Sequence, residues 1–561
     1  MDAETDAEIF KQPFIALFIH QSPAGDKTVA RRSDDNLTHN DYYSASEIKP
    51  GVWIGEGLER LGLKEGENVG REQFVSLCDN TNPNTGKLLT QRRNEDGKRR
   101  VFFDFTCSAP KSVSIMAVTM NDTRIIEAHE AAAKIALKEL ERFAGARIRR
   151  DGADSDRTTG NLVGAAFTHN SSRALDPQLH THFVLFNCTF DSKEKRWKAL
   201  QTSAMFDAIK YGTEIYRNEL ANRLHGMGYE IEKSSNGFQI KGVSKAIQTR
   251  FSKRSQERDA MIARMEKELG RKVTNNEISV AIHKTRSRKM KGISNEEVRK
   301  RQLAQIGFLE RMSLKSVLRS ANGKPKEIET PVRHDEAVAY AQAHAFERNS
   351  VVPDYELLQA ALAKGCGQMD LKQLKQELAD DRNLVRVGNQ YSSRQILETE
   401  LYLIDAMENA KDKVRPINPD YVPSPKLGRD QAGAVRLILK SPDLFTGIRG
   451  LAGTGKSTAL GELSSAIKTT GRYPIFCAPT AAATDALRKD GFEAVTLQKL
   501  LLDGSLQQRL TGRAVVILDE AGAVGIDDMK NLFVLAQQQG CRVVLSGDTG
   551  QVASQWLGHQ P

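Results

Sequence analysis

Three histidines lie close together in the sequence, at positions 169, 180 and 182. Alternate residues of a β-strand point to the same face, so His180 and His182 would project together from one strand. His169 lies near the end of the preceding apolar run, and an antiparallel pairing would bring it alongside them. Three neutral imidazoles on one face can bind a metal with open positions, which can polarise a phosphate for attack. The alternative is that all three are ordinary strand residues, because His-x-His alone is a weak signal.

A pair of adjacent tyrosines, Tyr42 and Tyr43, offers a nucleophile near the N-terminus. A phenolate can attack a phosphodiester and keep the bond energy in a phosphotyrosine link, which permits later rejoining without ATP. An ordinary tyrosine has a pKa near ~10, so the attack needs a neighbouring cation or base. Paired tyrosines are more often packing residues, and this pair by itself establishes nothing.

A phosphate-binding loop is predicted where GLAGTGKS fits the pattern G-x-x-x-x-G-K-S/T at every fixed position. The apolar run LFTGIR precedes it and a helix-like stretch follows, as the motif requires. Backbone N–H groups of the loop would close on the phosphates, Lys456 would hold the β- and γ-phosphates, and Ser457 would bind Mg²⁺. The loop residues assigned to the nucleotide are Gly450, Gly453, Thr454, Gly455, Lys456 and Ser457.

The apolar run VVILDE supplies the acidic partners of this loop. Asp519 would hold the Mg²⁺ and its water, and Glu520 would activate the attacking water. Gln431 lies shortly before the loop, where a glutamine that recognises adenine would lie. ATP with Mg²⁺ is therefore the expected cofactor of this region, and the alternative is a glycine-rich turn that binds no nucleotide.

Strand-like and helix-like segments alternate around the histidines. The run VFFDF at 101–105 predicts a strand, and the apolar spacing over 123–143 predicts a helix. The runs NLVGAAFTHN and THFVLFNCTF predict two strands, and the loop between them, with Asp176 and Pro177, suits an antiparallel hairpin. The fold class is therefore α/β overall, with an antiparallel sheet carrying the histidines, and a new α/β pattern begins at Arg429.

Length and charge indicate several domains and a polyanionic partner. The chain has 561 residues, a net charge of +10 and a pI of about 9.1. Residues 203–320 are predicted to be mostly helical and basic, although a solvated helix face explains such charge equally well. No apolar run approaches the roughly 18 residues of a spanning helix, and the acidic start lacks a secretory signal, so a cytoplasmic location is expected. The six cysteines are scattered, which argues against disulfides and a cysteine zinc site.

Four motifs together resemble the MobF family of conjugative relaxases, the TrwC and TraI type. The chain has DYY followed by WIGEGLERLGL, then DFTCSAPKSVS from Asp104, and DPQLHTH at 176–182. The resemblance implies that His169, His180 and His182 bind a divalent metal, Mg²⁺ or Mn²⁺ with Zn²⁺ as an alternative. It also implies that Asp104 orients a metal histidine or acts as base, and that Tyr42 or Tyr43 attacks the DNA. Many members carry two tyrosine pairs, whereas this chain has one, with no tyrosine before it.

The later motifs resemble those of superfamily 1 helicases of the RecD-like branch. APTAAATDALR begins at Ala478, and SGDTGQ ends at Gln551. The resemblance implies a RecA-like parallel-sheet domain in which Gln551 senses the γ-phosphate and Thr480 lies on the path of the single strand. Because the chain ends at Pro561 without a second RecA-like domain, we expect nucleotide binding without unwinding. The expected domains are 1–40, an extension; 41–320, the relaxase with its basic segment 203–320; 321–425, a connecting domain and linker; and 426–561, the first RecA-like domain of an incomplete motor.

The resemblance implies a strand-specific nickase that starts conjugative transfer in bacteria. It would recognise a hairpin and flanking single-stranded DNA at a transfer origin and remain attached to the 5′ end. A family member would meet a coupling protein and a type IV secretion channel, and would be exported with the DNA. Two alternatives remain: a rolling-circle replication initiator with the same chemistry, and a non-catalytic remnant that binds single-stranded DNA.

Overall fold

The computed structural model describes residues 15–21, 50–90, 100–150, 153–235, 237–274, 277–278, 281, 293–326, 328, 330–347, 349–450 and 455–547. The described residues form two compact units. The first runs to Ala341 and includes Leu358–Glu377, and the second comprises Gln342–Leu357 and the described residues from Leu378 onwards. The segment 321–425, expected as a connecting domain, is divided between these units. Tyr42 and Tyr43 lie outside the described residues, as do Gly453, Thr454 and Gln551.

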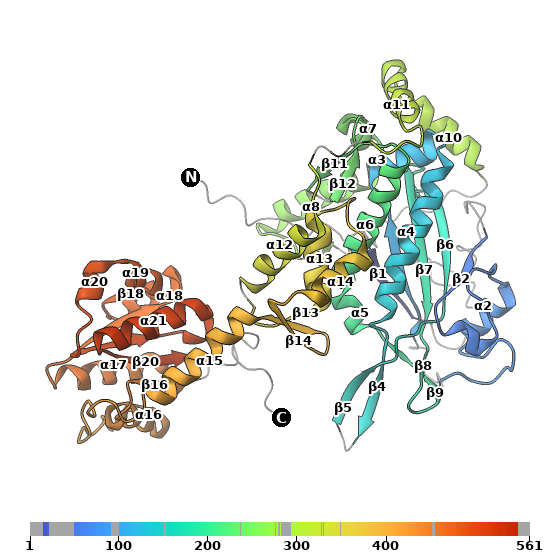
Figure 1. Ribbon diagram of the computed structural model, residues 1–561. Coiled ribbons are helices and arrows are strands. Elements are labelled where there is room, and N and C mark those ends of the chain that lie inside the picture. The colour runs from blue at the N-terminus through green and yellow to red at the C-terminus, as the bar shows by residue number, and fades with distance from the viewer. Residues whose placement is uncertain are drawn as a thin grey trace. The chain divides into compact units, whose positions relative to one another are not determined.

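The first unit is built on an antiparallel sheet, as predicted (Figure 1). Its strand order is β1 (Ile15–Gln21), β3 (Arg100–Ser108), β7 (Pro177–Phe186), β6 (Gly164–Ser171) and β2 (Val52–Ile54). The apolar, β-branched and aromatic residues of β3 are buried along almost its whole length. β6 and β7 form the predicted hairpin and pair from Gly164 with Leu185 to Ser171 with Pro177.

Helices cover one face of this sheet. Figure 1 shows α4 (Thr123–Glu141) and α6 (Ile209–Gly226) lying across it. The buried stripe of α4 is rich in alanine, which lets the helix approach the sheet closely. The opposite face packs against α2 (Arg71–Cys78), where Phe74 meets Phe167 and Phe186 edge-on at centroid distances of 5.9 and 5.2 Å.

Smaller elements complete the first unit. η1 (Leu58–Leu61), α3 (Lys111–Ser114) and the π-helical turn η2 (Ile115–Thr119) flank the sheet, and β4 (Gly145–Arg150), β5 (Ala153–Thr158) and β10 (Leu200–Gln201) form a second one. Two hairpins follow, β8 (Thr189–Asp191) with β9 (Arg196–Lys198), and β11 (Ile231–Ser234) with β12 (Gly237–Ile240). The segment 203–320 is mostly helical, with α5 (Ser203–Asp207), α7 (Lys245–Arg250), α8 (Lys253–Leu269), α10 (Asn295–Ala304) and α11 (Phe308–Ser320).

The second unit contains the predicted parallel sheet. Its order is β16 (Phe445–Arg449), β20 (Arg542–Gly547), β19 (Ala514–Leu518), β17 (Tyr473–Ala478) and β18 (Ala494–Thr496). Apolar clusters cover both faces, which explains why β19 is buried at every residue. The helices are α15 (Arg394–Asn409), α16 (Arg429–Lys440), α17 (Lys456–Lys468), α18 (Ala481–Lys489), α19 (Leu497–Leu502), α20 (Gly504–Gln508), η3 (Ala521–Ala523) and α21 (Ile526–Gln539).

In the sequence between these two sets of strands lie α12 (His334–Phe346), α13 (Asp354–Lys364) and α14 (Leu371–Asp380). A small antiparallel sheet orders β13 (Val352–Pro353), β15 (Gln390–Ser393) and β14 (Leu384–Val387). Among the helices of the described residues, none is long and apolar enough to cross a membrane.

Candidate metal centre and nucleotide site

The three histidines gather on one face of the β6–β7 hairpin. His169 is the cross-strand partner of His180, and His182 lies two residues further along β7. The ring centroids lie 5.4 Å apart for His169 and His180, 5.5 Å for His169 and His182, and 5.1 Å for His180 and His182. The hairpin register therefore brings together residues that the sequence separates by up to thirteen positions.

The spacing of these rings fits a shared metal ion. An ion bonded tetrahedrally to three imidazole nitrogens at about 2.1 Å holds the ring centroids roughly 5 Å apart. Within the described ranges, however, no group of three or more His, Cys, Asp or Glu side chains is arranged to hold a metal ion. The rings of His169 and His180 are stacked, 29° from parallel.

Asp104 fixes the orientation of one histidine. Its carboxylate is fully buried, and its two oxygens lie 3.0 and 2.9 Å from Nδ1 of His182. A carboxylate can only accept, so Nδ1 carries the hydrogen, and in the neutral ring Nε2 is the nitrogen that can bind a metal. The Thr106 hydroxyl, 3.0 Å from the same Nδ1, donates to Asp104 at 3.3 Å. Of the two roles considered for Asp104, this geometry favours the orienting one.

His180 is set up in a similar way. Its Nδ1 donates to the backbone carbonyl of Gln178 at 2.9 Å, which leaves Nε2 available. Burial, assisted by the neighbouring His182, lowers the pKa of His180 to about 3. The ring is therefore neutral near pH 7, which is the form that binds metals.

The segment that follows the tyrosine pair is anchored beside this sheet. Trp53 is buried, and Gly55 has a φ of 109°, where an added Cβ would lie 2.4 Å from the carbonyl oxygen of Leu162. Oε1 of Glu141 accepts the backbone N–H groups of Glu56 at 2.8 Å and Leu162 at 2.7 Å. Burial raises the pKa of Glu141 to about 7 despite these two donors. Sequence reasoning missed Glu141, because nothing local marks a helix-end carboxylate as an acceptor for distant loops.

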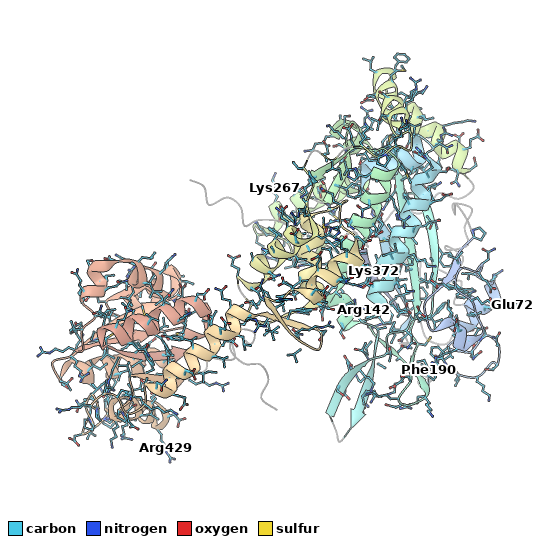
Figure 2. The ribbon with its side chains drawn as sticks, viewed as in Figure 1. Glu72, Arg142, Phe190, Lys267, Lys372 and Arg429 are labelled. Atoms are coloured by element: carbon cyan, nitrogen blue, oxygen red, sulfur yellow. The ribbon has the colours of Figure 1, made fainter. Side chains whose placement is uncertain are left out.

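One solvent-exposed helix of the segment 203–320, α8, carries five basic side chains. No residue of α8 is buried, and its cations are Lys253, Arg254, Arg258, Arg264 and Lys267. Figure 2 labels Lys267 near the C-terminal end of this helix. Arg258 pairs with Asp259 at 2.8 Å and Arg264 with Glu268 at 2.8 Å, so part of this charge is neutralised locally.

The described residues of the predicted phosphate loop lead into the N-terminus of α17. Gly455 caps α17 with a φ of 77°, and Lys456 and Ser457 begin that helix, whose N-terminus attracts anions. Gln431 donates from Nε2 to the carbonyl of Gly455 at 3.1 Å and accepts from the backbone N–H of Gly428 at 2.9 Å. The glutamine predicted to recognise adenine therefore lies against the loop.

The acidic residues lie at the carboxyl edge of the same sheet. β16 leads into Gly450 and β19 into Asp519, and both strands pair in parallel with β20. Asp519 accepts a hydrogen bond from Ser546 at 2.9 Å, and Glu520 adopts a left-handed φ of 52°, a strain typical of functional sites. Ser546 is the first residue of the SGDTGQ motif, but the resemblance to helicases implied a role only for the last residue of that motif, Gln551.

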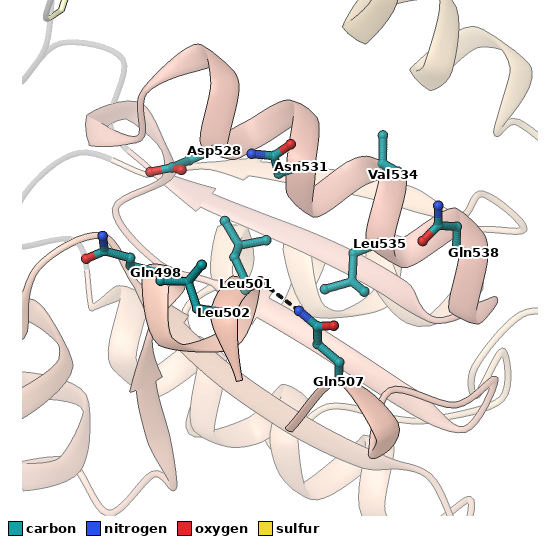
Figure 3. Close-up of a pocket in the computed structure, with 9 residues that line it drawn as sticks. All are labelled: Gln498, Leu501, Leu502, Gln507, Asp528, Asn531, Val534, Leu535 and Gln538. Atoms are coloured by element: carbon teal, nitrogen blue, oxygen red, sulfur yellow. Dashed lines mark hydrogen bonds between the residues drawn. The ribbon is translucent and has the colours of Figure 1, made fainter. Parts of the chain in front are cut away.

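A separate cavity of about 350 Å³ lies among α19, α20 and α21 (Figure 3). Amides and leucines line it, and Gln507 donates to the carbonyl of Leu501 at 2.7 Å. The lining includes none of the residues predicted to bind metal or nucleotide.

Comparison with known proteins identifies relatives of both regions. Residues 24–307 match the TrwC relaxase family, and residues 426–558 match the AAA domain family. The multifunctional conjugation protein TraI of Escherichia coli is 38% identical over 190 residues, which cover 32% of this chain and 10% of that protein. TraI of Escherichia coli strain K12 is 37% identical over 189 residues, with the same coverages. The chain thus matches only about a tenth of the length of these relatives.

Solved structures of a conjugative relaxase, TrwC, also match. A complex with oriT DNA has 28% identity and a TM-score of 0.44, and covers 54% of this chain and 98% of that one. A metal-bound complex with oriT DNA has 29% identity and a TM-score of 0.43, with the same coverages. Because the relaxase family match runs through half of the sequence, from residue 24 to residue 307, the chain belongs to the TrwC relaxase family.

Proposed function

We propose that this chain nicks one strand of DNA at a plasmid transfer origin and remains covalently attached to the 5′ end. The observation that carries the proposal is the pairing of Asp104 with His182 beside His169 and His180, on one sheet face of a relaxase-family chain. The spacing of the three rings supports the metal-binding part of the proposal.

The reaction is a transesterification that conserves phosphodiester bonds. The phenolate oxygen of Tyr42 or Tyr43 attacks the scissile phosphorus and forms a phosphotyrosine ester. The bond from phosphorus to the 3′-oxygen of the preceding nucleotide breaks, and that oxygen leaves with the electron pair and gains a proton. A bound divalent ion, Mg²⁺ or Mn²⁺, would supply the Lewis acid that polarises the phosphate. Reversal of the same steps rejoins the strand.

The chain's own residues would prepare this centre before DNA arrives. Asp104 holds the His182 ring with Nε2 directed away from the carboxylate, and Gln178 does the same for His180 through its carbonyl. Since His180 is already neutral, no proton need leave it when an ion binds. The cations of α8 would contact phosphates and position the single strand and hairpin without reading their sequence.

The second unit would bind ATP with Mg²⁺. Support comes from the AAA family match, from Gly455 at the start of α17 and from the hydrogen bond between Ser546 and Asp519. Lys456 would hold phosphates, Ser457 and Asp519 would hold the ion, and Glu520 would activate water. A coupling protein, a secretion channel and export with the DNA are proposed for this chain only through its family.

A plasmid-nicking assay tests the proposed function. A supercoiled plasmid that carries the transfer origin found next to the gene for this chain should be nicked at one site on one strand in the presence of Mn²⁺. It should remain supercoiled in the presence of a chelator. The His180→Ala variant should bind the DNA without nicking it. DNA binding without nicking by the wild type would favour the non-catalytic remnant, and nicking at a replication origin alone would favour the rolling-circle initiator.

A further inference from the structure

A buried polar network lies behind the metal face of the sheet. Thr168 and Thr181 are cross-strand partners, one step from the pair of His169 and His180. Alternate residues of a strand point to opposite faces, so Thr181 projects away from its neighbours His180 and His182. Both threonines are buried, with 8% and 2% exposure, on the side that α4 and α6 cover.

His129 of α4 is the centre of this network. Its Nε2 lies 2.9 Å from the Thr181 hydroxyl, and its Nδ1 lies 2.7 Å from the Tyr216 hydroxyl of α6. The Thr181 hydroxyl lies 3.0 Å from that of Thr168. His129 and Tyr216 are both fully buried, and burial keeps the imidazole neutral by lowering its pKa to about 3. One ring nitrogen therefore donates and the other accepts, which gives the chain of hydrogen bonds a direction.

Such a network constrains geometry more than it stabilises the fold. Apolar residues of similar size would fill this space without the cost of burying four polar groups. Hydrogen bonds in a dry interior instead fix donor and acceptor within tenths of an ångström, because an unmade bond there is expensive. The bonds join both histidine-bearing strands to one helix, at the residues beside the metal ligands.

We infer that His129 is a positioning residue for the metal centre, acting through Thr181 and Thr168. By fixing the two strands where they carry His169, His180 and His182, it would keep the three imidazoles at the spacing one ion requires. This inference rests on the proposed metal site. Asp104 and the Gln178 carbonyl hold the rings of His182 and His180 directly. His129 would act from the opposite face of the sheet, through the strands.

The experiment is a Mn²⁺ titration of the whole chain without DNA, followed by electron paramagnetic resonance of the free ion. Thr181→Val keeps the shape and removes the hydroxyl. Because Thr181 bonds His129 and Thr168 rather than a metal histidine, it should weaken Mn²⁺ binding by roughly three- to fivefold, less than the roughly tenfold minimum for groups that bond a ligand directly. His129→Asn places its amide near Nδ1 and loses Thr181, so it should behave like Thr181→Val. His129→Gln places its amide near Nε2, keeps the Thr181 bond and should bind almost as the wild type does.

The control separates positioning from general stability. Tyr229→Phe removes another buried hydroxyl of the same unit, one that donates to Asp122 at 2.7 Å and has no bond to the histidine strands. Its Mn²⁺ affinity should be unchanged even where its unfolding midpoint falls. The inference is overturned if Thr181→Val binds Mn²⁺ as the wild type does, or if affinity follows the unfolding midpoint across all variants. Absence of saturable Mn²⁺ binding by the wild type would instead refute the metal centre itself.

Discussion

Replacing Asp104 with asparagine should weaken metal binding while leaving the fold intact. The Asp104 carboxylate is fully buried and both of its oxygens lie within 3.0 Å of Nδ1 of His182. Asparagine has the same shape, and its amide oxygen can still accept the hydrogen of Nδ1, but its NH₂ group replaces the second oxygen that lies within 3.0 Å of the same Nδ1. The variant therefore removes the negative charge that makes the imidazole a stronger ligand, together with one of the two acceptors at Nδ1.

The expected loss can be bounded. Removal of a partner behind a metal histidine typically lowers metal affinity by about 10- to 100-fold, or roughly 1.4 to 2.8 kcal/mol. Asp104→Asn keeps one hydrogen bond and should lie near the lower bound. Asp104→Ala removes both carboxylate oxygens from Nδ1, although the Thr106 hydroxyl remains at 3.0 Å, and this variant should lie near the upper bound.

A calorimetric titration with Mn²⁺ measures this loss, and Asp191→Asn is its control. Asp191 is also buried, at 1% exposure, but accepts hydrogen bonds from Arg157 at 2.8 and 3.1 Å. This variant should lose stability without losing Mn²⁺ affinity. Unchanged affinity in Asp104→Asn, or an equal loss in Asp191→Asn, would refute the role assigned to Asp104.

Three further predictions concern other parts of the chain. The folded pKa of Glu141, about 7, exceeds its ordinary 4.5, so its contribution to stability is complete below pH 4.5 and is lost as pH rises through 7. The free energy of unfolding of Glu141→Gln should therefore exceed that of the wild type by up to about 3 kcal/mol at pH 8 and by little at pH 4.5. Urea unfolding followed by tryptophan fluorescence measures both values, and an equal difference at the two pH values would contradict the prediction. Lys456→Ala should reduce binding of a fluorescent ATP analogue by tenfold or more, and unchanged binding would disprove the phosphate contact. Ser546→Ala should slow any ATP hydrolysis while binding persists, because Asp519 loses a donor; loss of binding instead would indicate a structural role.

Local patterns predicted the elements that carry the candidate site. The β-branched run at 101–105 became part of β3, and the two runs around Asp176 became the β6–β7 hairpin. The helical spacing over 123–143 matched α4, which ends at Glu141. These predictions succeeded because strand and helix periodicities, and the residues that break them, are local properties of the sequence.

Contacts between distant segments could not be predicted in this way. Thr106 and Asp104 meet His182 only because β3 pairs with β7 in one register, and a shift of one residue would turn them to the other face. His129 lies in an ordinary amphipathic pattern, and only the packing of α4 on the sheet brings it to Thr181. Tyr42 and Tyr43 lie outside the described residues, so their role stays a prediction.

The most direct test of the central claim is a covalent-adduct assay. The purified chain, with Mg²⁺ or Mn²⁺ and a labelled single-stranded origin oligonucleotide, would be run on a denaturing gel. We predict a protein–DNA band that is abolished by a chelator and by one of the two variants Tyr42→Phe and Tyr43→Phe but not the other. The variant that loses the band would name the nucleophile. If the oligonucleotide shifts on native gels but gives no band that survives denaturation, for every origin sequence taken from beside the gene for this chain, the relaxase function is contradicted.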